Sequence, residues 1–187
     1  RDTDAKLFGD MLERAITIQI DDNRLDAEME AAAQDTFVSG RGVVRIRFEA
    51  DASGEAVTGE KLTFEAVSWR DFRMGACNRW DRCPWIAFRI PMTCEEVEAM
   101  ADPALLELQN DAYEKATEEE DDEKTVWEIW DRSKREVLFI EDGGRLLKRT
   151  PDPLEWPGFF PIPQPIQPIT RVGSMMPVCP FVVYQKL

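Results

Sequence analysis

The residues with the clearest capacity for chemistry in this sequence are carboxylates. Glu118 to Glu123 is a run of six consecutive acidic residues, and Mg²⁺ is bound by oxygen ligands held rigidly in near-octahedral geometry. A contiguous block of like charges repels itself and is usually a solvated loop. We therefore interpret the run as a weakly ordered surface segment and predict no metal site there.

A second acidic group, Glu95, Glu96 and Glu98, could supply a general acid and a general base. Thr93 and Glu96, however, have the T-x-x-E spacing of a capping box, and acidic residues in a first helical turn are stabilised by the helix dipole. The pattern predicts a helix that begins at Cys94. Capping thus accounts for these carboxylates without catalysis.

Histidine and cysteine add no catalytic arrangement. The chain contains no histidine, which removes the commonest general base and every Ser-His or Cys-His pair. Cys77, Cys83, Cys94 and Cys179 lack the spacing of a zinc site, so we predict reduced thiols, with a Cys77–Cys83 bridge left open as the alternative. The sequence predicts a protein that is not an enzyme, with no catalytic residue, no metal ligand and no cofactor.

Aromatic and cationic residues are interleaved between Trp69 and Trp85, a composition that suits either base stacking or protein contact. Asp71, Asp81 and a formal net charge of −14 oppose binding to a phosphate backbone. We therefore favour core packing and subunit contact for these residues. The interface candidates are Trp69, Arg70, Phe72, Trp80, Trp85, Phe159 and Phe160.

Two helices are predicted to begin the chain. Apolar residues recur at helical spacing over residues 3–20 and indicate a helix with one buried stripe. The polar break Asp21–Asn23 offers N-cap oxygens to a second helix over residues 25–37, and the two should form a hairpin or one kinked helix. A helix followed by glycine and a strand is the reverse order of a phosphate-binding loop, so Gly40 is interpreted as a helix C-cap.

Strands are predicted where the apolar period changes to two, and turn residues separate them. In the first strand Arg45 should face solvent, a loop over residues 51–59 should join the first two strands, and Pro84 and Pro91 should bracket the third. Pro103 suits the first turn of a further short helix. The predicted strands are residues 43–49, 61–67, 85–90, 126–131 and 136–141.

Residues 151–180 hold nine of the chain's 12 prolines. Proline excludes a helix there, and large apolar residues such as Phe159 and Phe160 are unusual in a free linker. We predict an extended arm, partly polyproline II, whose apolar side chains lie against another surface.

These elements predict an α+β fold with an N-terminal helical pair, a mainly antiparallel sheet built of hairpins, short middle helices and a proline-rich C-terminal arm. We predict a domain at residues 1–150 and the arm at residues 151–187. No apolar run approaches the roughly 20 residues that cross a bilayer, so we expect no membrane association.

Eight short segments stand in a distinctive order and spacing. Together they resemble the portal, or head-to-tail connector, proteins of short-tailed bacteriophages and their prophage relatives, and the resemblance spans most of the chain. No single segment is diagnostic. The segments are Asp35–Val44, Trp69–Arg73, Arg79–Trp80, Pro84–Arg89, Val126–Asp131, Pro151–Leu154, Gly158–Pro161 and Pro177–Phe181.

The resemblance implies a fragment of the wing, the outer mixed α/β part of a ring of usually twelve identical subunits. Double-stranded DNA would pass through that ring during packaging and ejection without specific binding. The implied partners are capsid, terminase and tail adaptor proteins, and the implied location is the virion, with the host cytoplasm during assembly. A helical stem is expected beyond Leu187, so we expect this chain by itself to be monomeric or weakly associating.

Two other classes stay open at this point. One is a divalent-metal carboxylate enzyme of nuclease-like type, in which acidic residues outside the Glu118 to Glu123 run would bind Mg²⁺ or Mn²⁺ saturably. The other is a generic acidic protein-interaction module, which would form no ring even at full length.

Overall fold

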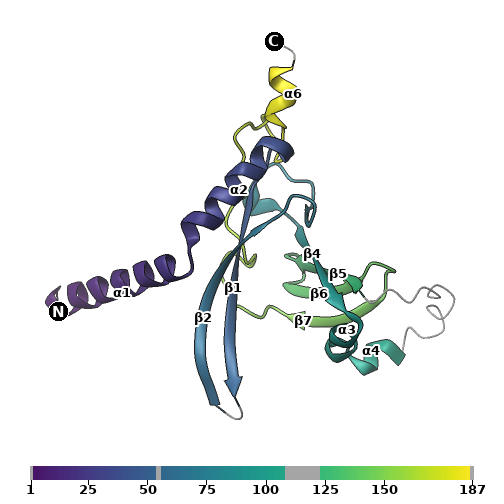
Figure 1. Ribbon diagram of the computed structural model, residues 1–187, viewed down its shortest axis with the longest axis horizontal. Coiled ribbons are helices and arrows are strands. Elements are labelled where there is room, and N and C mark those ends of the chain that lie inside the picture. The colour runs from purple at the N-terminus through teal and green to yellow at the C-terminus, as the bar shows by residue number, and fades with distance from the viewer. Residues whose placement is uncertain (1, 54–55, 108–122, 186–187) are drawn as a thin grey trace. The chain divides into compact units, whose positions relative to one another are not determined.

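The chain packs into two compact units, each with its own sheet. The computed structural model describes residues 2–53, 56–107 and 123–185. Helices and antiparallel sheets both occur (Figure 1), so the predicted α+β class is confirmed. Unit 1 comprises Arg1–Ser68, Pro161–Ile169 and Pro177–Leu187, and unit 2 comprises Trp69–Phe160 and Thr170–Met176.

The proline-rich stretch contributes to both units, so the units do not follow the predicted division at residue 150. That division rested on a change of composition, which marks where helices stop. Compact units are set by long-range contacts instead. These contacts group residues 151–160 and 170–176 with unit 2, and residues 161–169 and 177–180 with unit 1.

α1 (Asp2–Asp22) and α2 (Leu25–Ser39) form one path with a kink at Asn23 and Arg24 (Figure 1). The predicted N-cap oxygens do not cap α2. Instead, the side-chain nitrogen of Asn23 donates to the Gln19 carbonyl at 2.7 Å and closes α1. Arg24 then precedes α2 with a φ of 52°, in the left-handed region, which turns the chain into the new direction.

The apolar stripe of α1 is exposed, contrary to the prediction that it is buried. Leu7, Phe8, Met11 and Leu12 each expose at least half of their surface. A helical hairpin would have covered the stripe, but α2 continues beyond the end of α1 and does not fold back along it (Figure 1).

α2 ends at the predicted C-cap, Gly40, whose N–H donates to the Thr36 carbonyl at 2.8 Å. The φ of Gly40 is 77°, a conformation that favours glycine. Gly42 is required for a different reason, because a Cβ there would lie 2.0 Å from the Ala32 carbonyl oxygen. The helix and the following strand therefore touch backbone to backbone.

β1 (Val43–Ser53) and β2 (Ala56–Val67) form the antiparallel hairpin of unit 1. The prediction of a loop over residues 51–59 is wrong. Asp51 pairs with Gly59, and the ladder continues past a register shift to Ser53 and Ala56. Glycine and small polar residues favour turns but do not exclude pairing, so composition alone misplaced the turn.

Burial at the base of β1 does not alternate. Val43, Val44 and Arg45 are all buried, although Arg45 was predicted to face solvent. α2 packs across the hairpin, and the proline-rich segment runs along the other edge of β1. The prediction failed because it assumed that one side of the strand is open to water.

The proline-rich segment covers this edge of β1 through a few backbone hydrogen bonds. Gly42 and Ile166 exchange two bonds of 2.9 Å, and the Ile46 N–H donates to the Pro161 carbonyl at 2.8 Å. Pro161, Ile162 and Pro165 are buried, as expected of an arm that lies against another surface. Because proline has no N–H, the outer edge of this segment offers few donors to a further strand.

Unit 2 is built on a five-stranded antiparallel sheet. The predicted hairpin over residues 126–141 is confirmed. The strand β3 was not predicted, because its three residues are too few to show a period of two. A 3₁₀ turn, η1 (Trp80–Arg82), precedes the second strand. In spatial order the strands are β3 (Phe72–Met74), β4 (Trp85–Thr93), β5 (Glu123–Asp131), β6 (Glu136–Glu141) and β7 (Leu146–Pro151).

β4 continues through Pro91, which was predicted to end it. Pro91 pairs with Thr125 of β5, while β3 pairs with β4 only from Ile86 to Phe88. The missing N–H is tolerated because the edge of β4 beyond Phe88 has no partner in β3.

The capping box at Thr93 is confirmed. The Thr93 hydroxyl accepts from the Glu96 N–H at 3.3 Å, and the Glu96 carboxylate accepts from the Thr93 N–H at 2.8 Å. The Thr93 N–H, and secondly the Thr93 hydroxyl at 3.0 Å, donate to the Glu96 carboxylate and lower its pKa. The helix they begin, α3 (Cys94–Met100), buries Val97 in a small cluster with Val126 and Leu147.

Two further short helices complete the fold, α4 (Pro103–Glu107) and α6 (Pro180–Tyr184). The rest of the helix predicted to begin at Pro103 lies outside the described residues, as does most of the acidic run. Glu123, its last residue, begins β5. Among the described residues, every helix is too short or too polar to cross a bilayer.

We predict that Gly42→Ala destabilises unit 1 by about 1–3 kcal/mol, because the added methyl group meets the α2 backbone, which cannot move aside as a side chain can. Denaturant unfolding followed by circular dichroism at 222 nm reports on the helices of unit 1. All six tryptophans belong to unit 2, so the fluorescence transition should not move.

Gly9→Ala is the matched control, since Gly9 lies in α1 with no atom within 4 Å of its would-be Cβ. It should leave stability unchanged or raise it by up to about 1 kcal/mol. Equal destabilisation by both variants would contradict the close approach at Gly42.

Candidate protein interface

The seven interface candidates all lie in unit 2, but only some of them reach its surface. Trp69 and Trp85 are 39% and 38% exposed, Arg70 is exposed, and Trp80 is half-buried. The remaining three, Phe72, Phe159 and Phe160, are buried and present no surface to a partner in this conformation.

Phe72 is a core residue of the sheet. It pairs with Phe88 in the β3–β4 register, and the two rings lie 5.7 Å apart. Both are fully buried. The pair holds the short strand β3 on β4. It thereby fixes the position of Trp69 and Arg70, which lie in the turn just before β3.

Phe159 and Phe160 belong to a row of four aromatic rings. Ring centroids are 5.3 Å apart from Trp80 to Phe160, 5.6 Å from Phe160 to Phe159, and 5.4 Å from Phe159 to Trp130. These are the separations of favourable tilted and edge-to-face pairs. The row joins η1, the loop before Pro161 and strand β5.

Two arginines from the β5–β6 turn lie over the same row. The Arg132 guanidinium is 4.0 Å from the centre of the Phe160 ring and donates to the carbonyls of Trp80 at 2.9 Å and Gly158 at 3.2 Å. The Arg135 guanidinium is 5.5 Å from the centre of the Phe159 ring. We call this set, the four rings and the two arginines, the aromatic–arginine cluster.

Arg135 also ties the turn to the proline-rich stretch by an ion pair. Its guanidinium contacts the Asp152 carboxylate and donates to the Trp156 carbonyl at 3.4 Å. Cation–π contacts and charge-assisted hydrogen bonds hold a segment whose prolines cannot form a regular ladder. The cluster is therefore the main attachment of residues 152–160 to the sheet of unit 2.

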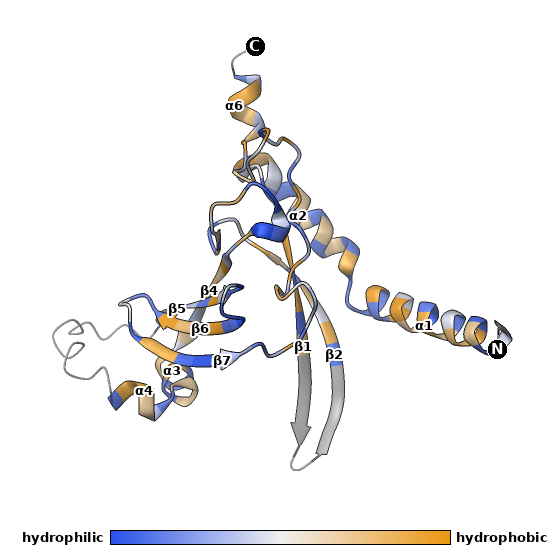
Figure 2. Cartoon of the chain, turned by 180° about the vertical axis from the view of Figure 1, so that it is seen from behind, coloured by the Kyte–Doolittle hydropathy of each residue, from blue (hydrophilic) through white to orange (hydrophobic). Residues whose placement is uncertain are grey.

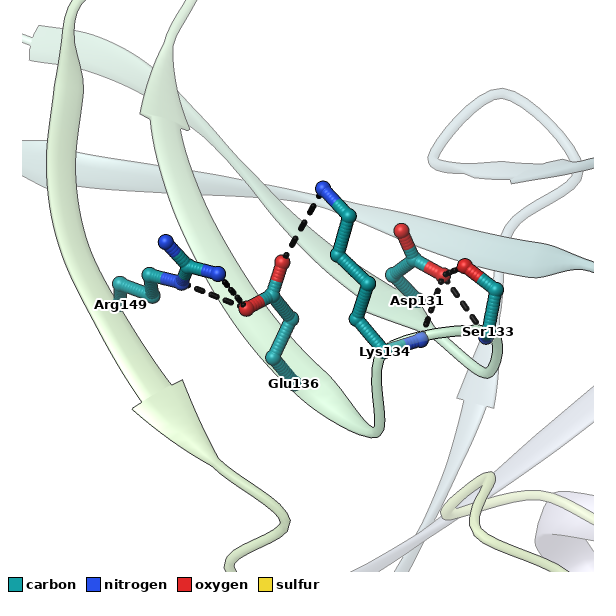
Figure 3. Close-up of polar contacts among 5 residues, drawn as sticks. All are labelled: Asp131, Ser133, Lys134, Glu136 and Arg149. Carbon is teal, nitrogen blue, oxygen red and sulfur yellow. Dashed lines mark hydrogen bonds and ion pairs between the residues drawn. The ribbon is translucent and has the colours of Figure 1, made fainter.

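The β5–β6 turn is shaped by Asp131 (Figure 3). One carboxylate oxygen accepts from the Ser133 hydroxyl at 2.5 Å, from the Ser133 N–H at 2.8 Å and from the Lys134 N–H at 3.4 Å. Hydrogen bonds to the ionised form lower the pKa of Asp131, with the Ser133 hydroxyl as the largest cause. This turn positions both arginines of the cluster.

The buried carboxylates of unit 2 are paired within the sheet. Figure 3 shows Glu136 between Arg149 of β7, at 2.5 Å, and Lys134, at 3.6 Å. Glu141 pairs with Lys124 at 2.9 Å, and Glu128 accepts from the Trp130 indole at 2.7 Å. Across residues 2–53, 56–107 and 123–185, no three His, Cys, Asp or Glu side chains gather as a metal site would require.

All four cysteines are free thiols, and Cys83 is buried. Burial raises the pKa of Cys83 to about 12, and the neighbouring Cys77 adds to this shift. The Cys83 thiol donates to the Trp85 carbonyl at 3.3 Å. A thiol that stays protonated is a poor nucleophile, so Cys83 acts as a small core residue.

The exposed part of unit 2 carries two cation–π pairs. Arg70 lies 5.4 Å from the Trp69 ring, and Arg73 lies 5.7 Å from the Trp127 ring. The Trp127 indole donates to Asp142 at 3.1 Å. We call these two pairs the Trp–Arg surface, and tryptophan and arginine are the residues most often found in interface hot spots.

Sequence reasoning identified Trp69 and Arg70 but missed Arg73 and Trp127. Trp127 alternates along β5 with the buried Val126 and Glu128, so strict period-two reading would have placed it on the outer face. Arg73 had no such signal, because its strand is too short to have a period.

The arginines of the cluster, Arg132 and Arg135, were also missed. They lie between the predicted strands 126–131 and 136–141, where the sequence indicates only turn residues. Their ring partners Phe159 and Phe160 lie more than twenty residues away along the chain. No local pattern brings the two segments together. No protein-family model and no curated protein sequence matches the chain.

We predict that Arg132→Ala destabilises unit 2 by about 2–3 kcal/mol, because it removes one cation–π contact and two charge-assisted hydrogen bonds. Denaturant unfolding followed by tryptophan fluorescence measures this. Arg79→Ala is the matched control, since Arg79 is exposed and pairs with the exposed Asp81, and it should change stability by less than about 0.5 kcal/mol. Equal effects of the two variants would count against the cluster.

We also predict that the stability advantage of the wild type over Asp131→Ala depends on pH. The folded-state pKa of Asp131 lies below the ordinary value of 3.8, so the ionised form stabilises the fold above that value. The advantage should be full near neutral pH and decline as the pH falls below 3.8. Ser133→Ala removes the largest cause of the shift and should flatten this dependence, and an unchanged pH profile would contradict the assignment.

Proposed function

We propose that this chain is a structural subunit of a phage portal vertex, from the wing region of a ring through which DNA is packaged and ejected. In this proposal the chain carries out no catalysis. Its partners are further copies of itself, twelve in the complete ring, together with capsid, terminase and tail adaptor proteins. It is located in the virion, and in the host cytoplasm during assembly.

The observation that carries the proposal is where the segments of the portal resemblance lie. Trp69–Arg73, Pro84–Arg89 and Val126–Asp131 are in adjacent strands β3, β4 and β5 or directly beside them. Gly158–Phe160 packs on the same unit through the aromatic–arginine cluster. These segments, although scattered in sequence, come together in unit 2, as expected if they belong to the framework of a family fold.

The surface chemistry of unit 2 supports a role in protein contact. Trp69 lies just before β3 and Trp85 begins β4, and both are large and partly exposed. Arg70 and Arg73 lie over indole rings. Rigid aromatic anchors lose little conformational entropy when a partner covers them. A ring subunit needs such surfaces because each copy must match its neighbour closely enough for the ring to close.

The charge of the chain suits a DNA conduit. A formal net charge of −14 repels phosphate, so a polymer moving past this chain would not adhere to it. The buried acidic side chains of the sheet pair with lysine and arginine, which leaves these cations less available to phosphate.

Negative-stain electron microscopy of the protein at its full natural length tests the proposal. We expect ring-shaped particles with a central hole and a uniform diameter. Particles that stay dispersed as monomers at micromolar concentration would contradict it. A matched sample of Phe72→Ala, which disrupts the sheet core, controls for rings formed by nonspecific aggregation and should lose the uniform particles.

A further inference from the structure

α1 is an amphipathic helix with one uncovered face. At 100° per residue its apolar side chains occupy about half of the helix circumference, and its central polar residues occupy the other half. Figure 2 shows the apolar colouring along the helix. The exposed apolar residues, from 50% for Leu12 to 70% for Phe8, are Leu7, Phe8, Met11, Leu12, Ile16 and Ile18.

A second apolar patch lies in the same unit, where the end of α2 meets α6. The two helices pack together, and the Cys179 thiol donates to the Phe37 carbonyl at 3.6 Å. We call this the α2–α6 patch. Its exposed members are Phe37, Val38, Phe181, Val182, Val183 and Tyr184. α1 and the α2–α6 patch lie at opposite ends of the kinked α1–α2 path (Figure 1).

The charge of α1 argues against a lipid surface as the occupant of its apolar face. The helix has six acidic residues and two basic ones, Lys6 and Arg14. Helices that lie on anionic membranes are rich in lysine and arginine on their polar face. A protein surface is the better match.

The size of the two patches fits contact between copies. Six side chains, each exposing about half of the 150–250 Å² that a large side chain can bury, give roughly 600 Å². Stable interfaces use about 800 Å² per partner, so α1 alone supplies most but not all of such an area. The two patches are separate, and each presents six exposed apolar side chains, so each copy offers both halves of a head-to-tail contact.

We propose that α1 of one copy of this chain docks on the α2–α6 patch of the next copy. The inference rests on the proposed function in one respect only, namely that a portal ring supplies the neighbouring copy. The contact is heterologous, so each copy can bind a further copy. The result is a closed ring if the rotation between neighbouring copies allows closure, and an open chain if it does not.

Two charge substitutions test the contact in the full chain. Met11→Glu places a carboxylate at the centre of the α1 face, and Phe181→Glu places one in the α2–α6 patch. Each should weaken self-association by at least tenfold in sedimentation velocity. The matched controls are Thr17→Glu, on the polar face of α1, and Gln185→Glu, just after α6. Both controls should associate as the wild type does, with unchanged circular dichroism in all four variants.

Mixing the two disabled variants separates a head-to-tail contact from a symmetric one. The Met11→Glu chain keeps its α2–α6 patch, and the Phe181→Glu chain keeps its α1 face, so the mixture should form one-to-one dimers that grow no further. A symmetric α1–α1 contact predicts no dimer between these two chains, and that result would overturn the inference.

The outcomes for this contact and for the ring are distinguishable. If the wild type forms open chains while the mixture forms dimers, the inference stands and the portal proposal fails. If the natural-length protein forms rings that Met11→Glu and Phe181→Glu leave intact, the portal proposal stands and the inference fails. Monomeric wild type at all concentrations overturns the inference.

Discussion

The main constraint on this structure is the proline-rich segment of residues 151–180. This segment must be held against the sheets although it cannot form the regular backbone hydrogen bonds of a strand. Each proline removes a donor, so only a few backbone hydrogen bonds, such as those of Gly42 with Ile166, hold the segment to β1 in unit 1. In unit 2 side chains add to backbone bonds such as the one from the Asp152 N–H to the Arg135 carbonyl at 3.0 Å, chiefly through the aromatic rings beneath Arg132 and Arg135. Both units include part of this segment, so it takes part in the packing of each.

A chain with a net charge of −14 must also limit the repulsion between its own carboxylates. The sheet does so by burying Glu136 and Glu141 against cations, and by using Asp131 as a turn-forming acceptor. Carboxylates employed in this way are dispersed among separate partners, whereas general acid–base catalysis needs them to converge on one reacting group. With the carboxylates used in this way, the exposed large aromatic side chains are the surface feature best suited to binding. We therefore interpret the protein as one that binds other protein surfaces.

Local chemistry could be predicted from the sequence where one short segment contains both partners. The capping box at Thr93 and the C-cap at Gly40 are examples. Features that depend on distant segments could not be predicted, because period and composition carry no information on what covers a strand or helix. Arg45 is buried by α2 and the proline-rich segment, and the α1 stripe is exposed because α2 does not fold back. For the interface, the sequence named seven candidates but could not say which of them reach the surface. Trp69, Arg70 and Trp85 are exposed, whereas Phe72, Phe159 and Phe160 are buried against partners that are remote in sequence.

The central claim is that the exposed aromatic side chains serve to fit neighbouring protein. Hydroxyl-radical footprinting measures it directly, because oxidation of each tryptophan, phenylalanine and methionine reports its access to solvent. We expect Trp69, Trp85 and Phe8 to be strongly protected in the assembled natural-length protein compared with the dissociated chain, while Trp130, buried in both, stays unreactive. Equal oxidation of these side chains in the two states would contradict the account.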